Sequence, residues 1–110
     1  MQFSLNGERE MVAEWIPEVE LEGYQGIVHG GIVSTVLDEA MAKVVAELEG
    51  GALTAELRVR FRRQVRSGER LRICGWIASR NKRKIETEAA LAAEDGTELA
   101  HAWAVFLAVK

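Results

Sequence analysis

The chain contains very few residues of several types, and each shortage excludes a class of protein. It has a single cysteine, Cys74, so it can form no intrachain disulfide and hold no thiolate metal cluster, which suits a reducing compartment. No apolar stretch approaches the roughly 20 residues that cross a bilayer. The first residues also lack the basic and apolar regions of a signal peptide. We therefore expect a cytoplasmic protein that is not embedded in a membrane.

The chain also lacks an excess of positive charge, because its formal net charge is −3. Nucleic acid is therefore not an expected partner. The 110 residues fit a single domain, residues 1–110, with no room for a separate cofactor domain, and we expect neither a cofactor nor a metal. The basic residues are nevertheless grouped, in residues 58–66 and 80–84. Such local groups suit a small anionic ligand.

One long helix is expected around residues 32–48. Apolar residues recur there at every third or fourth position and form a stripe wide enough to be nearly buried. Glycine pairs stand at both ends, at 30–31 and 50–51, and no proline interrupts the segment.

Most of the chain after the helix alternates between apolar and polar residues, which predicts strands. The segments are 53–61, 71–77, 85–93 and 99–109, with turns at Ser67-Gly68 and Asp95-Gly96. Ahead of the helix, Asn6-Gly7 indicates a turn between two short strands. One helix followed by four hairpin-linked strands predicts the α+β class, with an antiparallel sheet that curls around the helix.

Asp38 is the helix carboxylate that has no evident structural role. Glu39 stands four residues before Lys43, in the order that favours a solvated ion pair on a helix. Asp38 has no cation one turn away, and it lies too deep in the helix to act as a cap. It is therefore either a candidate catalytic group or an exposed aspartate at the edge of the apolar stripe.

The start of the helix offers a second candidate site. Gly30 and Gly31 place unobstructed N–H groups at the positive end of the helix, which suits a developing oxyanion, although two glycines also suit a plain turn. Eight residues separate Gly30 from Asp38, a distance of about 12 Å along a helix. One chain cannot readily apply both groups to the same carbonyl. If the two act together, they come from different subunits of a dimer.

The segment from Tyr24 to Ala40, with His-Gly-Gly at 29–31 and the acidic Asp38, resembles the signature of hotdog-fold acyl-CoA thioesterases. The branch it resembles contains the phenylacetate-pathway enzymes and the mitochondrial thioesterase-superfamily proteins. The resemblance continues through residues 50–54, 59–61 and 95–96, so it covers nearly the whole chain. It implies a hotdog fold and hydrolysis of an acyl-CoA to a free acid and CoA, with CoA as part of the substrate. Family members are homodimers, often paired further into dimers of dimers, with their sites at the subunit interface.

The resemblance also implies a role for each matching residue. Asp38 takes the place of the catalytic carboxylate, as general base or nucleophile, and the Gly30 N–H polarises the thioester carbonyl. Thr54 takes the place of a hydroxyl residue that holds the water or the carboxylate, although strand parity puts it on the face of the arginines. Further expected substrate-binding residues are His29, Gly31 and Gln25 near the thioester, and Arg62, Arg80, Lys82 and Arg83 near the CoA phosphates.

Three other interpretations remain at this point. Another hotdog enzyme, a hydratase or dehydratase, relies on a histidine in a motif that this chain lacks. A non-catalytic acyl-CoA-binding or regulatory hotdog domain needs nearly the same pocket as a thioesterase. A nucleic-acid-binding module is opposed by the net charge. The acyl-chain specificity is open, with Met41, Val45 and Trp103 as candidates for the residues that limit the pocket.

Overall fold

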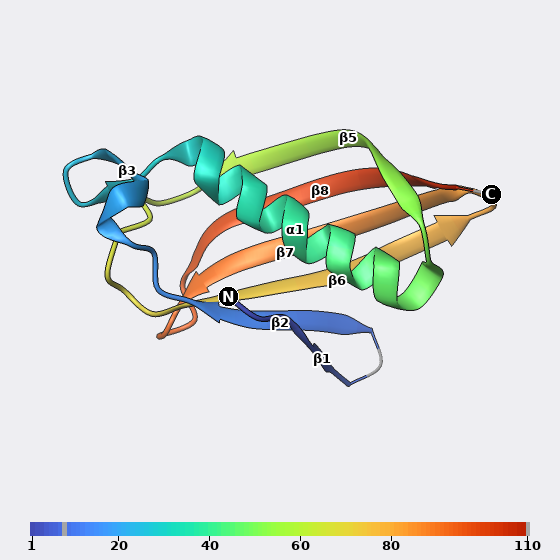
Figure 1. The fold of residues 1–110 in the computed structure, drawn as a ribbon, viewed down its shortest axis with the longest axis horizontal. Helices are drawn as coiled ribbons and strands as arrows, with labels where there is room; N and C mark the ends of the chain where they lie inside the picture. Colours follow the sequence, from blue (N-terminus) through green and yellow to red (C-terminus); the bar gives the residue numbers. More distant parts are fainter. Residues whose placement is uncertain (8, 110) are drawn as a thin grey trace.

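The computed structural model describes residues 1–7 and 9–109. A single long helix, α1 (Gly30–Glu49), lies across one face of a six-stranded antiparallel sheet (Figure 1). A short 3₁₀-helix, η1 (Val19–Leu21), and a small hairpin of β3 (Glu22–Tyr24) and β4 (Ile27–Val28) come just before α1. The strands of the large sheet are β1 (Ser4–Asn6), β2 (Glu10–Trp15), β5 (Ala52–Phe61), β6 (Leu71–Asn81), β7 (Lys84–Ala93) and β8 (Glu98–Ala108). The expected α+β class is confirmed.

The core lies between α1 and the sheet that curls around it. Leu37, Ala40, Met41 and Val44 on the helix are fully buried, as the periodic apolar stripe predicts. The helix begins at Gly30 and ends at Glu49, just before Gly50, whose φ of 87° suits only glycine without strain. The described residues include no helix that is long and apolar enough to cross a membrane.

A close approach fixes α1 against the middle of the sheet. A Cβ atom built on Gly75 of β6 would lie 2.7 Å from the carbonyl oxygen of Ala40. Real Cβ atoms essentially never come so close to another atom, so only glycine lets the helix backbone rest on this strand. The small residues at this contact set the distance between the two layers of the fold.

The order of the strands departs from the hairpin series that the sequence predicts. In the sheet the order is β1-β2-β6-β7-β8-β5, so β5 pairs with β8 and not with its neighbour in sequence, β6. The segment between β5 and β6 crosses the fold instead of forming a hairpin, and it is anchored by the buried Val65. As a result β5 is an edge strand, and it runs beside α1 (Figure 1).

Candidate active site

His29 caps the start of α1, because its side chain accepts a hydrogen bond from one of the free N–H groups there. The N–H of Gly31 donates a hydrogen bond to Nδ1 of His29 at 2.9 Å. Nδ1 is therefore unprotonated, and a neutral ring carries its proton on Nε2. A Cβ atom on Gly31 would lie 3.1 Å from this ring, so the second glycine makes room for the cap. His29 thus shapes the turn, as the resemblance implies.

The N–H of Gly30 is the amide that this arrangement leaves free. The next two amides, of Ile32 and Val33, both donate to the carbonyl oxygen of His29, at 3.0 and 3.2 Å. Within residues 1–7 and 9–109, the Gly30 N–H has no acceptor. It lies at the positive end of a 20-residue helix, and Gly30 is one of the residues that line a cavity of about 350 Å³. A carbonyl oxygen that entered this cavity could accept a hydrogen bond from it.

Asp38 lies two turns further along α1, and one of its carboxylate oxygens has no hydrogen-bond partner among the described residues. Oδ1 is shielded from solvent and accepts no hydrogen bond from any residue that the structure describes. Burial raises the pKa of the Asp38 carboxyl above its ordinary value, and the charge of the adjacent Glu39 raises it further. Glu39 itself is exposed and contacts Lys43 at 3.8 Å, as the spacing of the two residues predicts.

A carboxylate without hydrogen bonds is a costly feature in a folded protein. Such groups with a raised pKa concentrate at sites that move protons, because a raised pKa makes the carboxylate a stronger base. Gly30 and Asp38 remain about 12 Å apart along the axis of α1. The fold of one chain therefore does not bring these two groups to a common point.

Thr54 lies on a different face of β5 from the one that strand parity indicates. A β-bulge between Thr54 and Glu56 inserts Ala55 as an extra residue, so that Thr54 pairs with Phe106 while Arg58 pairs with Trp103. Residues opposite each other in a ladder share a face. Since Phe106 is buried in the core, Thr54 points to the side of the sheet that α1 covers. The prediction that Thr54 shares a face with the arginines was wrong, because the alternation of apolar and polar residues in the sequence does not reveal the bulge.

The basic residues expected near CoA lie in two places, at opposite ends of α1. Arg62 lines the cavity beside Gly30, but its guanidinium is held by Glu98 at 3.1 Å. Arg80 contacts Glu49 at the far end of α1, at 2.7 Å, and Arg83 donates to the carbonyl oxygen of Ala108. These two lie with Lys82 around the β6–β7 turn, about 30 Å along the helix from Gly30. The fold of one chain therefore does not gather Arg62 and these three basic residues at one place.

The sequence analysis did not predict the β3–β4 hairpin, which brings Gln25 to the exposed turn between two short strands. A Cβ atom on Gly23 of this hairpin would lie 3.4 Å from Cα and Cδ2 of His29, so the hairpin packs on the cap. Gln25 donates or accepts no side-chain hydrogen bond among the described residues. The signal that could have indicated the hairpin is Gly26, which has a φ of 78°.

Sequence comparison places this geometry in a known family. Residues 25–100 match the model of the thioesterase superfamily, and this match includes His29, Gly30, Asp38 and Thr54. The chain belongs to the thioesterase superfamily. The long helix with its curled antiparallel sheet is the hotdog fold of that superfamily, as the resemblance implies.

Individual members of the superfamily share most of the chain. The acyl-coenzyme A thioesterase THEM4 of Xenopus laevis is 31% identical over 108 residues, which are 98% of this chain and 48% of the relative. The chain therefore spans about half the length of that curated relative.

Solved structures share the fold. A crystal structure of a thioesterase superfamily protein is 26% identical with a TM-score of 0.86, over 89% of this chain and 48% of the other. A hypothetical thioesterase from Streptococcus pneumoniae, solved with coenzyme A, is 16% identical with a TM-score of 0.89, over 96% of this chain and 86% of the other.

Proposed function

We propose that this protein is an acyl-CoA thioesterase, which hydrolyses the thioester bond of an acyl-CoA to a free carboxylic acid and CoA. The observation that carries the proposal is the pair of unsatisfied groups on α1, the free N–H of Gly30 and the shielded oxygen of Asp38. Membership of the thioesterase superfamily and the likeness to an acyl-coenzyme A thioesterase support the reaction. The coenzyme A held by a protein of the same fold supports the substrate class.

In this proposal Gly30 and Asp38 act from opposite sides of the reacting carbonyl. The oxygen of the thioester accepts a hydrogen bond from the Gly30 N–H, which stabilises the negative charge that develops on it. Asp38 removes a proton from a water molecule, and the resulting hydroxide attacks the carbonyl carbon. The C–S bond then breaks, and the proton held by Asp38 passes to the departing sulfur. Thr54, on the α1 side of the sheet, helps to hold the water or the carboxylate.

Asp38 could instead attack the carbonyl carbon itself and form an anhydride that water then hydrolyses. The raised pKa of its carboxyl favours the general base, because it marks a stronger proton acceptor. A single turnover in ¹⁸O-labelled water separates the two routes. The general base leaves the protein unlabelled, whereas the anhydride route puts ¹⁸O into the Asp38 carboxylate when water attacks its carbonyl.

The proposal includes a homodimer, because the 12 Å between Gly30 and Asp38 requires that they serve one substrate from two subunits. The edge strand β5 supports a second copy as the partner. It has ten residues, an edge with which no described strand pairs, and exposed apolar side chains at Leu53 and Leu57. A long apolar edge strand is an open template for pairing with another chain. Further pairing into dimers of dimers, and a cytoplasmic location consistent with the free Cys74 thiol, belong to the same proposal.

Release of free thiol from acyl-CoAs of different chain types tests the function, with Asp38→Asn and Glu39→Gln as matched variants. We expect the Asp38 variant to lose at least about a hundred-fold in kcat, the usual size of a general-base contribution, while Glu39→Gln stays within about two-fold of wild type. Loss of activity in the Glu39 variant alone would refute the assignment of Asp38. Tight CoA binding without any thiol release would identify a non-catalytic binding domain instead.

A further inference from the structure

The cavity beside Gly30 has a mostly apolar wall. It is lined by the end of β4, the first turns of α1 and the segment that follows β5, and its apolar side chains are those of Ile27, Val28, Val33, Phe61 and Val65. Val28, Val33 and Val65 are buried residues of the core, so this part of the wall is rigid. An apolar wall next to a free N–H suits a ligand that carries a carbonyl group on an apolar chain.

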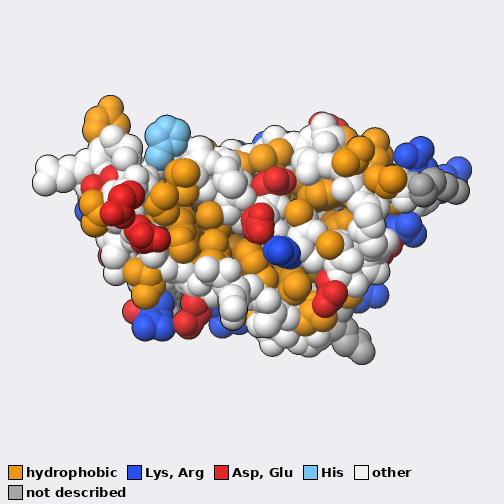
Figure 2. All heavy atoms as spheres, in the orientation of Figure 1, with side chains coloured by type: hydrophobic (Ala, Val, Ile, Leu, Met, Phe, Trp, Pro, Cys, Tyr) orange, Lys and Arg blue, Asp and Glu red, His pale blue; other side chains and the backbone are white. Residues whose placement is uncertain are grey.

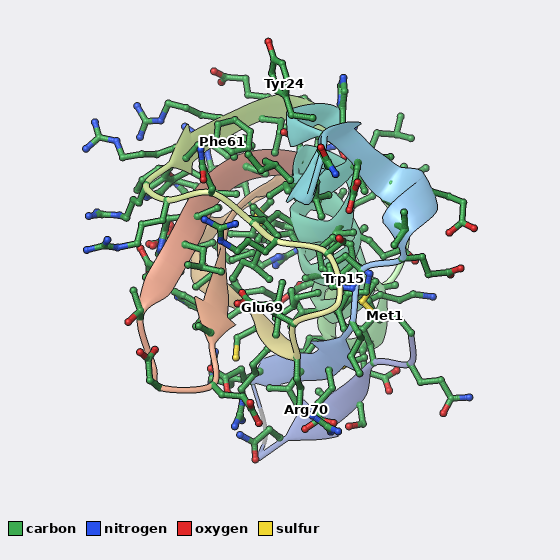
Figure 3. All side chains as sticks on the ribbon, turned by 90° about the vertical axis from the view of Figure 1, so that its left-hand side faces the viewer. Met1, Trp15, Tyr24, Phe61, Glu69 and Arg70 are labelled. Carbon is green, nitrogen blue, oxygen red and sulfur yellow. The ribbon has the colours of Figure 1, made fainter. Side chains whose placement is uncertain are left out.

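Phe61 stands at the mouth of this cavity, at the end of β5. The tip of its ring, Cζ, lies 3.5 Å from the position that a Cβ atom on Gly30 would occupy, and Cε1 lies 3.7 Å from it. Figure 3 shows Phe61 beside the start of α1. The backbone N–H groups of Arg62 and Arg63 both donate to the carbonyl oxygen of Leu99, which fixes the end of the strand and with it the ring. Phe61 is nevertheless 52% exposed, so much of the ring remains free to contact a ligand.

We propose that this cavity receives the acyl chain of the substrate and that Phe61 selects the chain. The inference rests on the proposed thioesterase function and extends it to the substrate class. A carbonyl oxygen bound to the Gly30 N–H lies about 2.9 Å from the nitrogen. Since the tip of the Phe61 ring lies within contact distance of the Cβ position of the same residue, we place the carbonyl carbon and its substituent next to that ring. A flexible linear chain can turn past this tip and follow the apolar wall. A rigid ring attached directly to the carbonyl carbon cannot turn and meets Phe61.

The other part of the substrate fits this wall less well. The pantetheine arm of CoA carries two amide groups that need hydrogen-bond partners. The side chains of Ile27, Val28, Val33 and Val65 offer none. The polar lining residues, Arg62, Arg63 and Gln64, all lie in the one segment after β5, and Arg62 is already paired with Glu98. Figure 2 shows apolar side chains gathered on the molecular face where α1 lies, interrupted near its middle by charged groups of both signs. The structure therefore favours the apolar portion of the substrate as the occupant of the cavity.

The test is a comparison of kcat/KM for octanoyl-CoA and benzoyl-CoA in wild type and in Phe61→Ala. We expect wild type to prefer octanoyl-CoA, and we expect Phe61→Ala to raise the benzoyl-to-octanoyl ratio by about ten-fold or more, the usual effect of reshaping an apolar pocket by a few carbon atoms. Ile16→Ala is the matched control. Ile16 is an apolar residue as exposed as Phe61, at 51%, but it follows β2 near the opposite edge of the sheet from β5, and its loss should leave the ratio unchanged.

The result also separates this inference from the proposed function. If wild type hydrolyses neither these nor other acyl-CoAs, the thioesterase function itself fails. If wild type is active and Phe61→Ala changes kcat/KM for both substrates by the same factor, the ring contacts the common CoA arm, and the inference is overturned. The milder Phe61→Leu should change the ratio in the same direction by a smaller factor, and light scattering on each variant checks that the oligomeric state is that of wild type.

Discussion

Replacing Asp38 by asparagine should abolish activity and at the same time stabilise the fold. The carboxylate oxygen Oδ1 is shielded and accepts no hydrogen bond among the described residues, so ionised Asp38 weakens the folded state. An unsatisfied buried polar group costs about 1–3 kcal/mol. Asparagine keeps an uncharged polar atom at this position and removes the charge, which is the costlier part to bury. Because the Asp38 side chain is only partly buried, we take the lower end of that range and expect Asp38→Asn to raise the free energy of unfolding by about 1 kcal/mol at pH 7.

The sign of the effect with pH follows from the raised pKa of the Asp38 carboxyl. Its ordinary value is 3.8, and burial moves the folded-state value upward. Between those two values the folded protein holds a proton that the unfolded chain has lost, so the stability of wild type falls as the pH rises through this window. Asp38→Asn lacks the titrating group and should not show this fall. Its stability advantage should therefore be absent below pH 3.8 and fully developed above the raised pKa.

Urea denaturation of both proteins at several pH values, at one fixed protein concentration, measures the difference directly. Glu39→Gln is the control, because Glu39 is exposed and its contact with Lys43 is long, at 3.8 Å. An exposed pair of this kind contributes less than about 1 kcal/mol, so this variant should stay close to wild type. If Asp38→Asn is instead less stable than wild type at pH 7, the carboxylate has a stabilising partner and the reasoning is refuted.

Three further predictions concern the same helix. The acid limb of kcat/KM against pH should have its midpoint above 3.8, because the Asp38 carboxyl must be ionised to accept a proton; a pH–rate profile measures it. Gly75→Ala should lower the free energy of unfolding by about 1–3 kcal/mol, because its Cβ would meet the backbone of Ala40; urea denaturation measures it. His29→Ala should cost about 1 kcal/mol in the same assay, because the Gly31 N–H loses its acceptor.

Each of these substitutions has a matched control. Gly51→Ala introduces the same Cβ atom where nothing lies within 4 Å, so it should be nearly neutral where Gly75→Ala is not. His29→Asn keeps an acceptor that can reach the N–H of Gly31, and it should recover most of the lost stability. An acid limb centred below 3.8 would mean that a group other than Asp38 controls the rate.

The sequence predicts α1 well because local features define it. Gly50 supplies the left-handed residue that ends the helix, and the apolar stripe from Val33 to Val45 matches the side that packs on the sheet. Asp38 is also recognisable, since its lack of a partner on the helix surface can be counted along the sequence. These properties depend on residues within two turns of one another.

The sequence does not predict properties that depend on distant parts of the chain. The pairing of β5 with β8 follows from how the sheet curls. The bulge at Ala55 turns Thr54 to the helix side, and the alternation of apolar and polar residues gives no sign of it. The ion pair of Arg62 could not be predicted for the same reason. Its partner Glu98 is 36 positions away in the sequence, and only the fold brings the two charges together.

The surroundings of the candidate residues for limiting the acyl pocket also depend on the tertiary structure. Met41 and Val45 are buried in the core of the same subunit, and Trp103 lies on the sheet face away from α1, beneath the guanidinium of Arg58. Phe61, which the alternation treats as an ordinary strand residue, reaches Gly30 because β5 ends beside the start of α1. Contacts between the end of one element and the start of another carry little signal in a single sequence.

The central claim is that Gly30 and Asp38 of different subunits act on one substrate, and a pair of variants can isolate each half of that arrangement. Gly30→Pro removes the N–H while keeping the helix start, because proline is favoured at the first helical position and His29, with φ −59° and ψ 134°, has the backbone that precedes proline. Gly30→Ala retains the N–H and controls for the added side chain, which would lie 3.5 Å from Phe61.

The most direct measurement is the activity of a mixed dimer that joins one Gly30→Pro subunit to one Asp38→Asn subunit, purified through two different tags. Each variant alone should be inactive. In the mixed dimer, one of the two symmetric sites receives both intact groups, so the account predicts about half of the wild-type activity per dimer. A mixed dimer as inactive as its parents would show that both groups must belong to the same chain, and would contradict the account.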